Sequence, residues 1–143
     1  HQARRRPQSG CHMTGASELR ADELPINPKD QQRLEAILTR IGAEHGPFDA
    51  LLMAVGAYDP AWRDIHLDPE EAVEVAVAMG GGLVLPIHWC TFVLAPHPWA
   101  EPVERLLAAA GAAGVEGAVP KVGQRIDPSA PPDADPWWVR LDA

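Results

Sequence analysis

The residues best suited to chemistry lie around His88, which directly follows a short apolar run. Residues 83–87 have the length and composition of a buried strand, and His88 and Trp89 come immediately after them. In an open α/β sheet, ligands and metals bind just beyond the carboxyl ends of the strands. Neutral imidazole is the commonest protein ligand for zinc-like metals. His88 is therefore either a metal ligand facing a cleft or a core histidine bonded to a carbonyl.

A second polar group follows an earlier apolar run, residues 48–55. The stretch 57–67 has no periodicity and mixes aromatic with charged side chains, as loops that shape pockets do. Tyr58 could supply a hydroxyl, and His66 could approach His88 where a strand-end loop meets a helix-entry loop. Alternatively, His66 supports the cap of the next helix, while Tyr58 and Trp62 only cover the core.

The other histidines, cysteines and tryptophans favour structural roles. His12, His45 and His97 are predicted to be surface residues. Cys90 is predicted to be a small buried residue, because nothing near it in the sequence would lower its pKa and make it a nucleophile. Trp89 either packs in the core or forms the wall of a pocket beside the preceding histidine.

The sequence does not contain the spaced ligands of a complete metal site. It has no His-x-His motif, no Asp-His pair and no histidine pair at ligand spacing. Its glycine run at 80–82 precedes an apolar strand, whereas a phosphate loop follows a strand and opens a helix. Neither a dinuclear metal site nor a phosphate loop can be assembled from these motifs alone.

Composition limits the classes of function. The chain has 143 residues, enough for one domain, and its net charge is −8. Beyond residue 20 it holds 8 Lys or Arg and 19 Asp or Glu, so this part is acidic and nucleic-acid binding is not predicted. No apolar run approaches the roughly 18 residues of a membrane helix. The two distant cysteines, Cys11 and Cys90, fit the cytoplasm better than a disulfide framework.

The elements that would position these residues alternate between helix and strand. Residues 1–25 predict a loose lead-in that is not necessarily native, and residues 26–143 one folded unit. Caps, helix-starting prolines and apolar spacing predict helices from Pro28 to about Gly42 or Gly46, from Pro69 to residue 79, and from Pro102. Strands are predicted at 48–55, at 83–87 and, more briefly, at 118–119. We expect both faces of the first strand to be covered, and Trp137 and Trp138 to pack back onto an α/β sandwich with a mainly parallel sheet.

Four motifs carry a family resemblance when they are taken in order. They are Gly46-Pro47-Phe48-Asp49, the run from Val55 to Trp62, the run from His66 to Ala72, and Pro86-Ile87-His88-Trp89-Cys90-Thr91-Phe92. Together they resemble the C-terminal half of metallo-β-lactamase-fold hydrolases of the N-acyl-phosphatidylethanolamine phospholipase D type, whose relatives include UlaG-like lactonases. The likeness runs from about residue 47 to residue 99 and continues more weakly to residue 138.

The resemblance implies a fold, a cofactor and a reaction. The fold would be the C-terminal half of an αββα sandwich, with His88 a late ligand of a two-metal site that usually holds zinc. His66 and Tyr58 would shape the active site or contact the substrate, with Trp89 as a neighbour. The implied reaction is hydrolysis of a phosphodiester, or a related ester or lactone, by a metal-bound hydroxide, on a small-molecule or lipid-like substrate.

Three departures from the family pattern limit this expectation. The family's N-terminal half, with its His-x-His-x-Asp-His motif, is not in this sequence. The turn that carries a bridging aspartate has only a poor counterpart at residues 9–15, with Cys11 in the place of the acid. The usual His-Trp-Gly-Thr-Phe motif has Cys90 in the place of glycine. The isolated chain is therefore predicted to be catalytically silent.

Two hypotheses follow from these observations. The first is a fragment of a metal-dependent hydrolase, with His88 its one surviving ligand. The alternative is a non-catalytic α/β half-domain that acts as a binding or assembly module. In both, half a sandwich would expose one apolar face of its sheet, which predicts a homo-oligomer or pairing with a missing N-terminal half.

Overall fold

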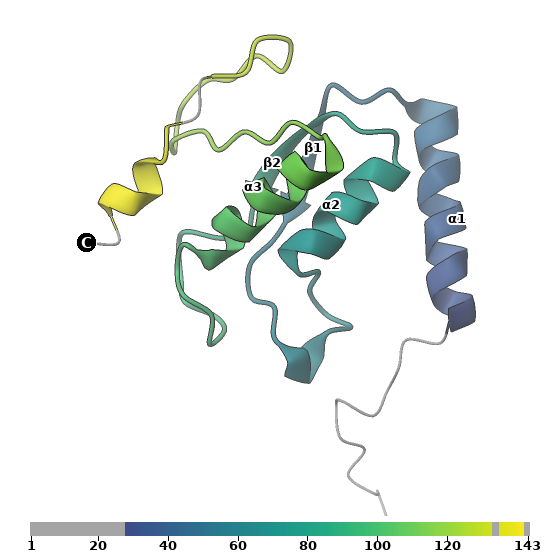
Figure 1. Ribbon diagram of the computed structural model, residues 1–143, viewed down its shortest axis with the longest axis horizontal. Coiled ribbons are helices and arrows are strands. Elements are labelled where there is room, and N and C mark those ends of the chain that lie inside the picture. Colours follow the sequence, from purple (N-terminus) through teal and green to yellow (C-terminus); the bar gives the residue numbers. More distant parts are fainter. Residues whose placement is uncertain (1–27, 133–134, 142–143) are drawn as a thin grey trace, which may run out of the picture.

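The computed structural model describes residues 28–132 and 135–141, so the predicted lead-in at 1–25, with Cys11 and His12, lies outside the described part. Within these described residues, three helices, two strands and two short 3-10 turns follow one another (Figure 1). In order they are α1 (Pro28–His45), β1 (Ala50–Ala54), η2 (Pro60–Trp62), α2 (Pro69–Ala78), β2 (Leu83–Ile87), α3 (Glu101–Ala113) and η3 (Trp137–Arg140).

Helix α2 begins where its sequence predicts. The Asp68 carboxylate accepts a hydrogen bond from the Glu71 backbone N–H at 2.9 Å, and the Glu71 carboxylate accepts one from the Asp68 N–H at 3.0 Å. This reciprocal pair satisfies two backbone donors that the first helical turn leaves free, and Pro69 occupies the position that needs none. Ala72, Val73 and Ala76 are buried, because α2 packs against both the sheet and α3.

The two strands form a parallel pair, as predicted for an α/β chain. In the register, Ala50 lies opposite Leu83 and Ala54 lies opposite Ile87. Strand β2 has the bounds that the sequence indicates, while β1 is three residues shorter than the apolar run at 48–55. The α/β fold class is confirmed. In Figure 1, helices α2 and α3 lie side by side over one face of this sheet.

The predicted third strand is reduced to a single bridge. Val84 donates its N–H to the Glu116 carbonyl at 2.8 Å and accepts from the Ala118 N–H at 3.0 Å. In a parallel ladder the next donors are two residues further along each chain. Both positions, Pro86 and Pro120, are prolines and have no N–H to donate. The ladder between β2 and this segment therefore stops after one bridge.

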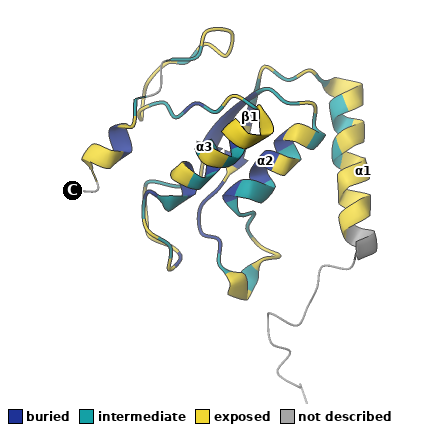
Figure 2. Ribbon diagram, in the orientation of Figure 1, coloured by how far each residue is buried: buried dark blue, intermediate teal, exposed yellow. Residues whose placement is uncertain are grey.

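The main core lies between the sheet and the two covering helices. Val55, Val84 and Leu106 are fully buried there, together with Ala72 and Ala76 (Figure 2). Burial of a Val or Leu side chain stabilises the fold by roughly 1.5 to 3 kcal/mol.

The opposite face of the sheet corrects the prediction that both faces of β1 are covered. Burial alternates along β1, and Leu52 is 63% exposed. Ile87, which shares this face on β2, is 43% exposed. Only one part of the face is covered, where Ala118 and Ile126 pack against Leu85. Successive side chains of a strand point to opposite faces, so an unbroken apolar run predicts that both faces are covered. The described residues fully cover only one of the two faces.

Helix α1 has the predicted extent, but the described residues bury little of its apolar stripe. Leu34 and Ile37 are exposed, while Leu38 and Ile41 are half-buried. The helix approaches the end of α2 at Gly42, where an added Cβ would lie 2.4 Å from the Met79 carbonyl oxygen. Glycine is therefore needed for this contact, which attaches α1 to α2 at the side of the molecule seen in Figure 1.

The C-terminal tryptophans pack back onto the fold, as predicted. Trp137 and Trp138 are buried, and they form a cluster with Val103 and Ala100 of the α3 region. The Trp137 indole N–H donates to the Val119 carbonyl at 3.0 Å, which fixes the tail against the segment after α3. Among the described residues, no helix combines the length and the apolarity needed to cross a membrane.

Candidate functional site

His88 lies at the end of β2, at the edge of the sheet where the sequence predicts a site. It is exposed and has a left-handed backbone with φ of 61°. His66, which precedes the cap of α2, stacks on it with ring centroids 5.2 Å apart and 23° between the ring planes. The structure therefore brings together the two histidines that stand 22 positions apart in the sequence.

The turn after β1 packs against the backbone that carries His88. The Val55 N–H donates to the Ile87 carbonyl at 3.1 Å, which extends the pairing of the strands by one bond. At Gly56, an added Cβ would lie 2.0 Å from the carbonyl oxygen of His88. Only glycine allows the two loops to approach this closely, so the Gly56 backbone forms a wall against the peptide that carries His88.

Beside the histidine pair lies a cluster of charged side chains around Arg105, hereafter the Arg105 cluster: Tyr58, Glu70, Glu101 and Arg105. Arg105 forms a two-bond ion pair with Glu70, and its Nη1 lies 3.3 Å from the Glu101 carboxylate. The Tyr58 hydroxyl donates to Glu101 at 2.7 Å, and the Arg105 guanidinium lies 4.8 Å from the centre of the Tyr58 ring. The cluster joins the first turns of α2 and α3 to the loop after β1.

These contacts change the proton affinities of the cluster. Burial, and then the bond to Glu101, raise the pKa of Tyr58 to about 12, so its hydroxyl keeps its proton at neutral pH. The ion pair with Arg105 lowers the pKa of Glu70, and the same pair raises the pKa of Arg105. The tyrosine hydroxyl is therefore a bound donor and not a base.

A cleft of about 420 Å³ opens beside His66 and the Arg105 cluster. Its lining includes His66, Tyr58, Arg63, Asp68, Glu101 and Arg105. The volume lies in the range of small-molecule sites in proteins. Tyr58 and His66, which the sequence predicts as neighbours of an active site, thus share one cleft, while their contact with a substrate stays a prediction.

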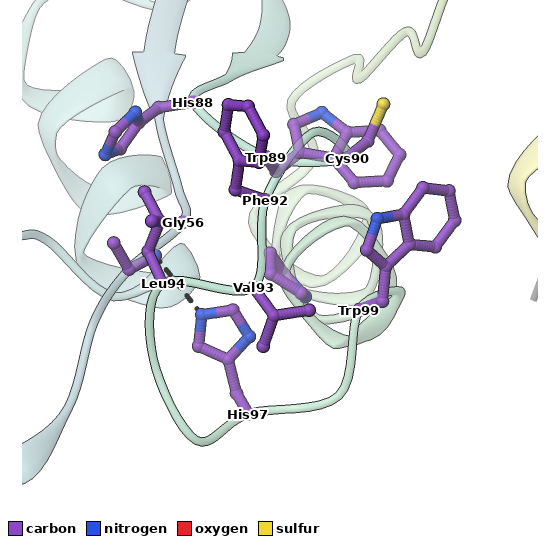
Figure 3. Close-up of a pocket in the computed structure, with 11 residues that line it drawn as sticks. Gly56, His88, Trp89, Cys90, Phe92, Val93, Leu94, His97 and Trp99 are labelled. Atoms are coloured by element: carbon purple, nitrogen blue, oxygen red, sulfur yellow. Dashed lines mark hydrogen bonds between the residues drawn. The ribbon is translucent and has the colours of Figure 1, made fainter.

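His88, Trp89 and Cys90 line a second, much smaller cavity of about 10 Å³ (Figure 3). Trp89 packs against three other indoles, Trp99, Trp137 and Trp138, with ring centroids 5.7 to 6.1 Å apart. Cys90 is half-buried, and burial raises the pKa of its thiol, which agrees with the prediction of an inert cysteine. A role for Trp89 in recognition remains a prediction.

His97, predicted to be a surface residue, is half-buried, and its ring makes contacts that the sequence did not indicate. Its ring stacks on Tyr58 with centroids 4.4 Å apart, and its Nε2 accepts a hydrogen bond from the Ala57 N–H at 3.2 Å. Figure 3 shows this ring turned toward the turn at Gly56, with the bond drawn as a dashed line. The Pro-His-Pro context, in which two prolines stiffen the chain around the ring, is the one local signal that could have indicated a fixed side chain. His45, by contrast, is exposed as predicted.

The described residues do not fit a complete zinc site. Within residues 28–132 and 135–141, no group of three or more His, Cys, Asp or Glu side chains could hold a metal ion. A zinc site needs three or four protein ligands around one ion. His66 and His88 stack face to face, a geometry in which the two rings do not converge on a shared ion. A zinc ion bound by His88 would therefore need further ligands from outside the described residues.

Comparison with known proteins agrees with the α/β fold. Residues 30–89, which include both histidines, match the Beta-lactamase superfamily domain. This confirms the resemblance to the metallo-β-lactamase fold.

The chain is also 33% identical over 82 residues to the N-acyl-phosphatidylethanolamine-hydrolyzing phospholipase D 1 of Caenorhabditis elegans, which covers 55% of this chain and 23% of that protein. The mitochondrial protein of the same description in Saccharomyces cerevisiae is 35% identical over 57 residues, or 38% of this chain and 12% of the yeast protein. The chain is therefore similar to N-acyl-phosphatidylethanolamine phospholipases D, as its motifs predict.

A stronger similarity links the chain to uncharacterized proteins of mycobacteria. It is 57% identical over 103 residues to proteins of Mycobacterium tuberculosis and Mycobacterium bovis, which covers 70% of this chain and 28% of each relative. The chain thus spans less than a third of the length of these relatives. Their names assign no activity, so the hydrolase connection comes from the superfamily domain and from the phospholipases.

Proposed function

We propose that this chain is the C-terminal part of a metal-dependent hydrolase domain that cleaves a phosphodiester or a related ester or lactone. The supporting observation is the position of His66 and His88. Both lie within the segment that matches the Beta-lactamase superfamily domain, and their rings stack at the carboxyl edge of the sheet. Ligands of α/β proteins bind at this edge. His88 would contribute one imidazole to a metal centre whose other ligands come from outside the described residues.

The cleft beside His66 would receive the substrate. Its volume of about 420 Å³ suits a small molecule or the head of a lipid-like ester. The Tyr58 hydroxyl keeps its proton and is already bonded to Glu101, so its role would be to shape the cleft wall. Relatives named as phospholipases support an ester of this kind. A cytoplasmic location stays a prediction from the cysteine content.

Zinc binding of the isolated chain tests this proposal. A single imidazole binds zinc weakly, whereas a complete site binds it stoichiometrically at micromolar protein. We expect no bound zinc after gel filtration of the purified chain, and no hydrolysis of a phosphodiester or lactone. Adding the remaining part of a full-length relative should then produce stoichiometric zinc binding that the His88→Ala variant weakens at least tenfold.

His45→Ala is the matched control, because His45 is an exposed histidine on α1. Equal zinc affinity of the His88→Ala and His45→Ala complexes would remove His88 from the metal centre. Tight zinc binding by the isolated chain, lost in His88→Ala, would mean that the chain completes a site by itself and would contradict the proposed division of ligands.

The exposed face of the sheet supports the alternative, a non-catalytic binding or assembly module. Leu52 and Ile87 are apolar and face away from the helices, so a partner or a second copy of the chain could cover them. Sedimentation velocity distinguishes these states. A concentration-dependent dimer that Leu52→Lys dissociates would favour self-assembly, and a monodisperse monomer would count against it.

A further inference from the structure

The ring of His97 is fixed by bonds at both of its nitrogens. Nε2 accepts the Ala57 backbone N–H at 3.2 Å, so this nitrogen carries no proton. The proton is therefore on Nδ1, which lies 3.1 Å from the Pro98 carbonyl oxygen and donates to it. The hydrogen bonds thus specify one neutral tautomer, with the ring face stacked on Tyr58.

The residue that His97 holds, Ala57, is bound from two sides in a strained conformation. Its φ is 61°, a left-handed value that is unfavourable for an L-residue with a side chain. Its N–H is held by His97, and its carbonyl accepts the Trp62 indole N–H at 2.7 Å. Such a conformation persists where surrounding contacts enforce it. His97, Ala57 and Trp62 therefore form a clamp, hereafter the Ala57 clamp.

The Ala57 clamp is connected to His88 through the neighbouring residue Gly56. Gly56 precedes the clamped alanine, and its Cα lies so close to His88 that an added Cβ would lie 2.0 Å from the His88 carbonyl oxygen. The close approach leaves no free space between the two loops. A change in the backbone at Ala57 would therefore move the wall against which the His88 peptide rests.

The clamp is connected to His66 through the turn after Trp62. The Trp62 carbonyl accepts the Ile65 N–H at 3.0 Å, and His66 is the next residue in the chain. Release of the Trp62 indole from Ala57 would therefore free the short turn that carries the His66 ring. Each member of the stacked pair is thus connected to Ala57, His88 through the contact at Gly56 and His66 through the turn after Trp62.

We propose that His97 is a positioning residue for the His66 and His88 pair, acting through Ala57 and Trp62. It fixes the distance and orientation of the two rings without touching the substrate. This role rests on the proposed function only in that the pair is the part of the active site that the chain supplies. The geometry of the clamp itself is independent of any metal.

The first experiment uses the unmodified chain with ¹⁵N-labelled histidine. Long-range proton–nitrogen spectra distinguish the two neutral tautomers of each ring. We expect His97 to show a proton on Nδ1 and none on Nε2 at pH 7.5. An Nε2–H tautomer or a doubly protonated ring would overturn the proposal, because neither can accept the Ala57 N–H.

The second experiment uses His97→Phe, which keeps an aromatic ring against Tyr58 and removes both nitrogens. Loss of one backbone hydrogen bond should raise the rate of Ala57 amide hydrogen exchange about fivefold or more. The ring resonances of His66 and His88 should shift as well. His97→Gln, whose side-chain carbonyl can accept the same N–H, should restore part of the protection.

His45→Phe is the control, since it alters an exposed histidine away from the clamp. Unchanged His66 and His88 resonances in His97→Phe, equal to those in His45→Phe, would overturn the proposal. If circular dichroism shows that His97→Phe is unfolded, Trp62→Phe replaces it, because that variant keeps an aromatic ring and removes the N–H donor to the Ala57 carbonyl. The same shifts of the His66 and His88 ring resonances are then expected, and their absence would overturn the proposal.

The two proposals can fail separately. If a full-length relative shows no dependence of zinc binding on His88, while the tautomer and exchange results are as expected, the proposed function fails and the clamp remains. If zinc binding depends on His88 but His97→Phe leaves both histidine rings unmoved, the positioning role fails and the proposed function remains.

Discussion

The Arg105 cluster and the His66 and His88 pair differ in how far their side chains are engaged, although His66 lines the same cleft as Tyr58, Glu101 and Arg105. In the Arg105 cluster the guanidinium is shared between Glu70 and Glu101, and the Tyr58 hydroxyl has a carboxylate partner. In the histidine pair, His88 is exposed, and the contact between the two residues is a ring stack. The first region is a completed structural unit, whereas the described residues provide no hydrogen-bond partner for the imidazole nitrogens of the second.

This contrast can be tested first at Tyr58, where the expected effect is largest. Tyr58 is the one tyrosine in the sequence, so phenolate absorbance at 295 nm reports it alone. Burial and Glu101 raise its pKa to about 12 from the ordinary value of 10.0. At pH 10.5 we expect about 3% phenolate in the folded chain and about 75% in urea. Because the pKa is raised, the stabilisation is complete below pH 10 and is lost as the pH rises toward 12.

Glu101→Gln sharpens the test. It keeps an acceptor oxygen for the hydroxyl but removes the negative charge, so the pKa of Tyr58 should fall part of the way toward 10. Circular dichroism at each pH confirms that the chain is folded. A titration near pH 10 in the folded chain would show that the Tyr58 hydroxyl is open to water and would end the distinction between the two regions.

The second largest effect is expected for Arg105→Met, which keeps much of the side-chain volume. It would leave Glu70 and Glu101 close together without their cation. Removing one partner of a buried ion pair costs about 3 to 5 kcal/mol, and Arg105 is 35% exposed, so we expect about 2 kcal/mol in urea unfolding. Arg40→Met is the control, since Arg40 is an exposed residue 3.9 Å from Glu44, and it should cost less than about 0.5 kcal/mol.

The stability difference between the unmodified chain and Arg105→Met should depend on pH because of Glu70. Because Arg105 lowers the pKa of Glu70 below its ordinary 4.5, the ion pair stabilises the fold above that value and is lost as the pH falls. The gap between the unmodified chain and Arg105→Met should therefore narrow between pH 5 and pH 3. A gap that stays constant over this range would indicate that Arg105 stabilises the fold through packing alone.

The sequence predicts the local elements well because their signals are local. The cap at Asp68 with Pro69 gives the start of α2, and the apolar run at 83–87 gives β2. The Arg105 cluster could not be predicted, since its ion pair joins residues 35 positions apart. The bond from Ala57 to His97 spans 40 positions and was missed for the same reason. Contacts at these separations depend on how the elements pack, which periodicity does not encode.

At Cys90, where the sequence departs from the family motif, the side chain has two opposing effects on stability. Where the family motif has glycine, this residue has φ of 61°, a conformation that glycine adopts without strain. Its thiol also packs against the tryptophan cluster. Substitution by glycine would thus relieve backbone strain and remove side-chain contacts at once.

Comparing Cys90→Gly with Cys90→Ala separates these two effects. Both variants lose the sulfur, but only glycine relieves the left-handed backbone. We expect Cys90→Gly to be more stable than Cys90→Ala by about 1 kcal/mol in urea unfolding. Equal stability of the two variants would mean that the loop relaxes away from this conformation, and the position of His88 two residues earlier would then be less firmly fixed.

The smallest effect is expected for His88→Ala. The side chain is exposed and its ring contact is a stack with His66, so we expect a loss of less than about 0.5 kcal/mol, a quarter of the effect of Arg105→Met. His45→Ala provides the reference for an exposed histidine. A loss above about 1 kcal/mol would mean that His88 holds the fold together, as Arg105 does. A loss below about 0.5 kcal/mol would agree with the proposal that His88 serves a metal centre, because the stability of the fold would then not depend on its side chain.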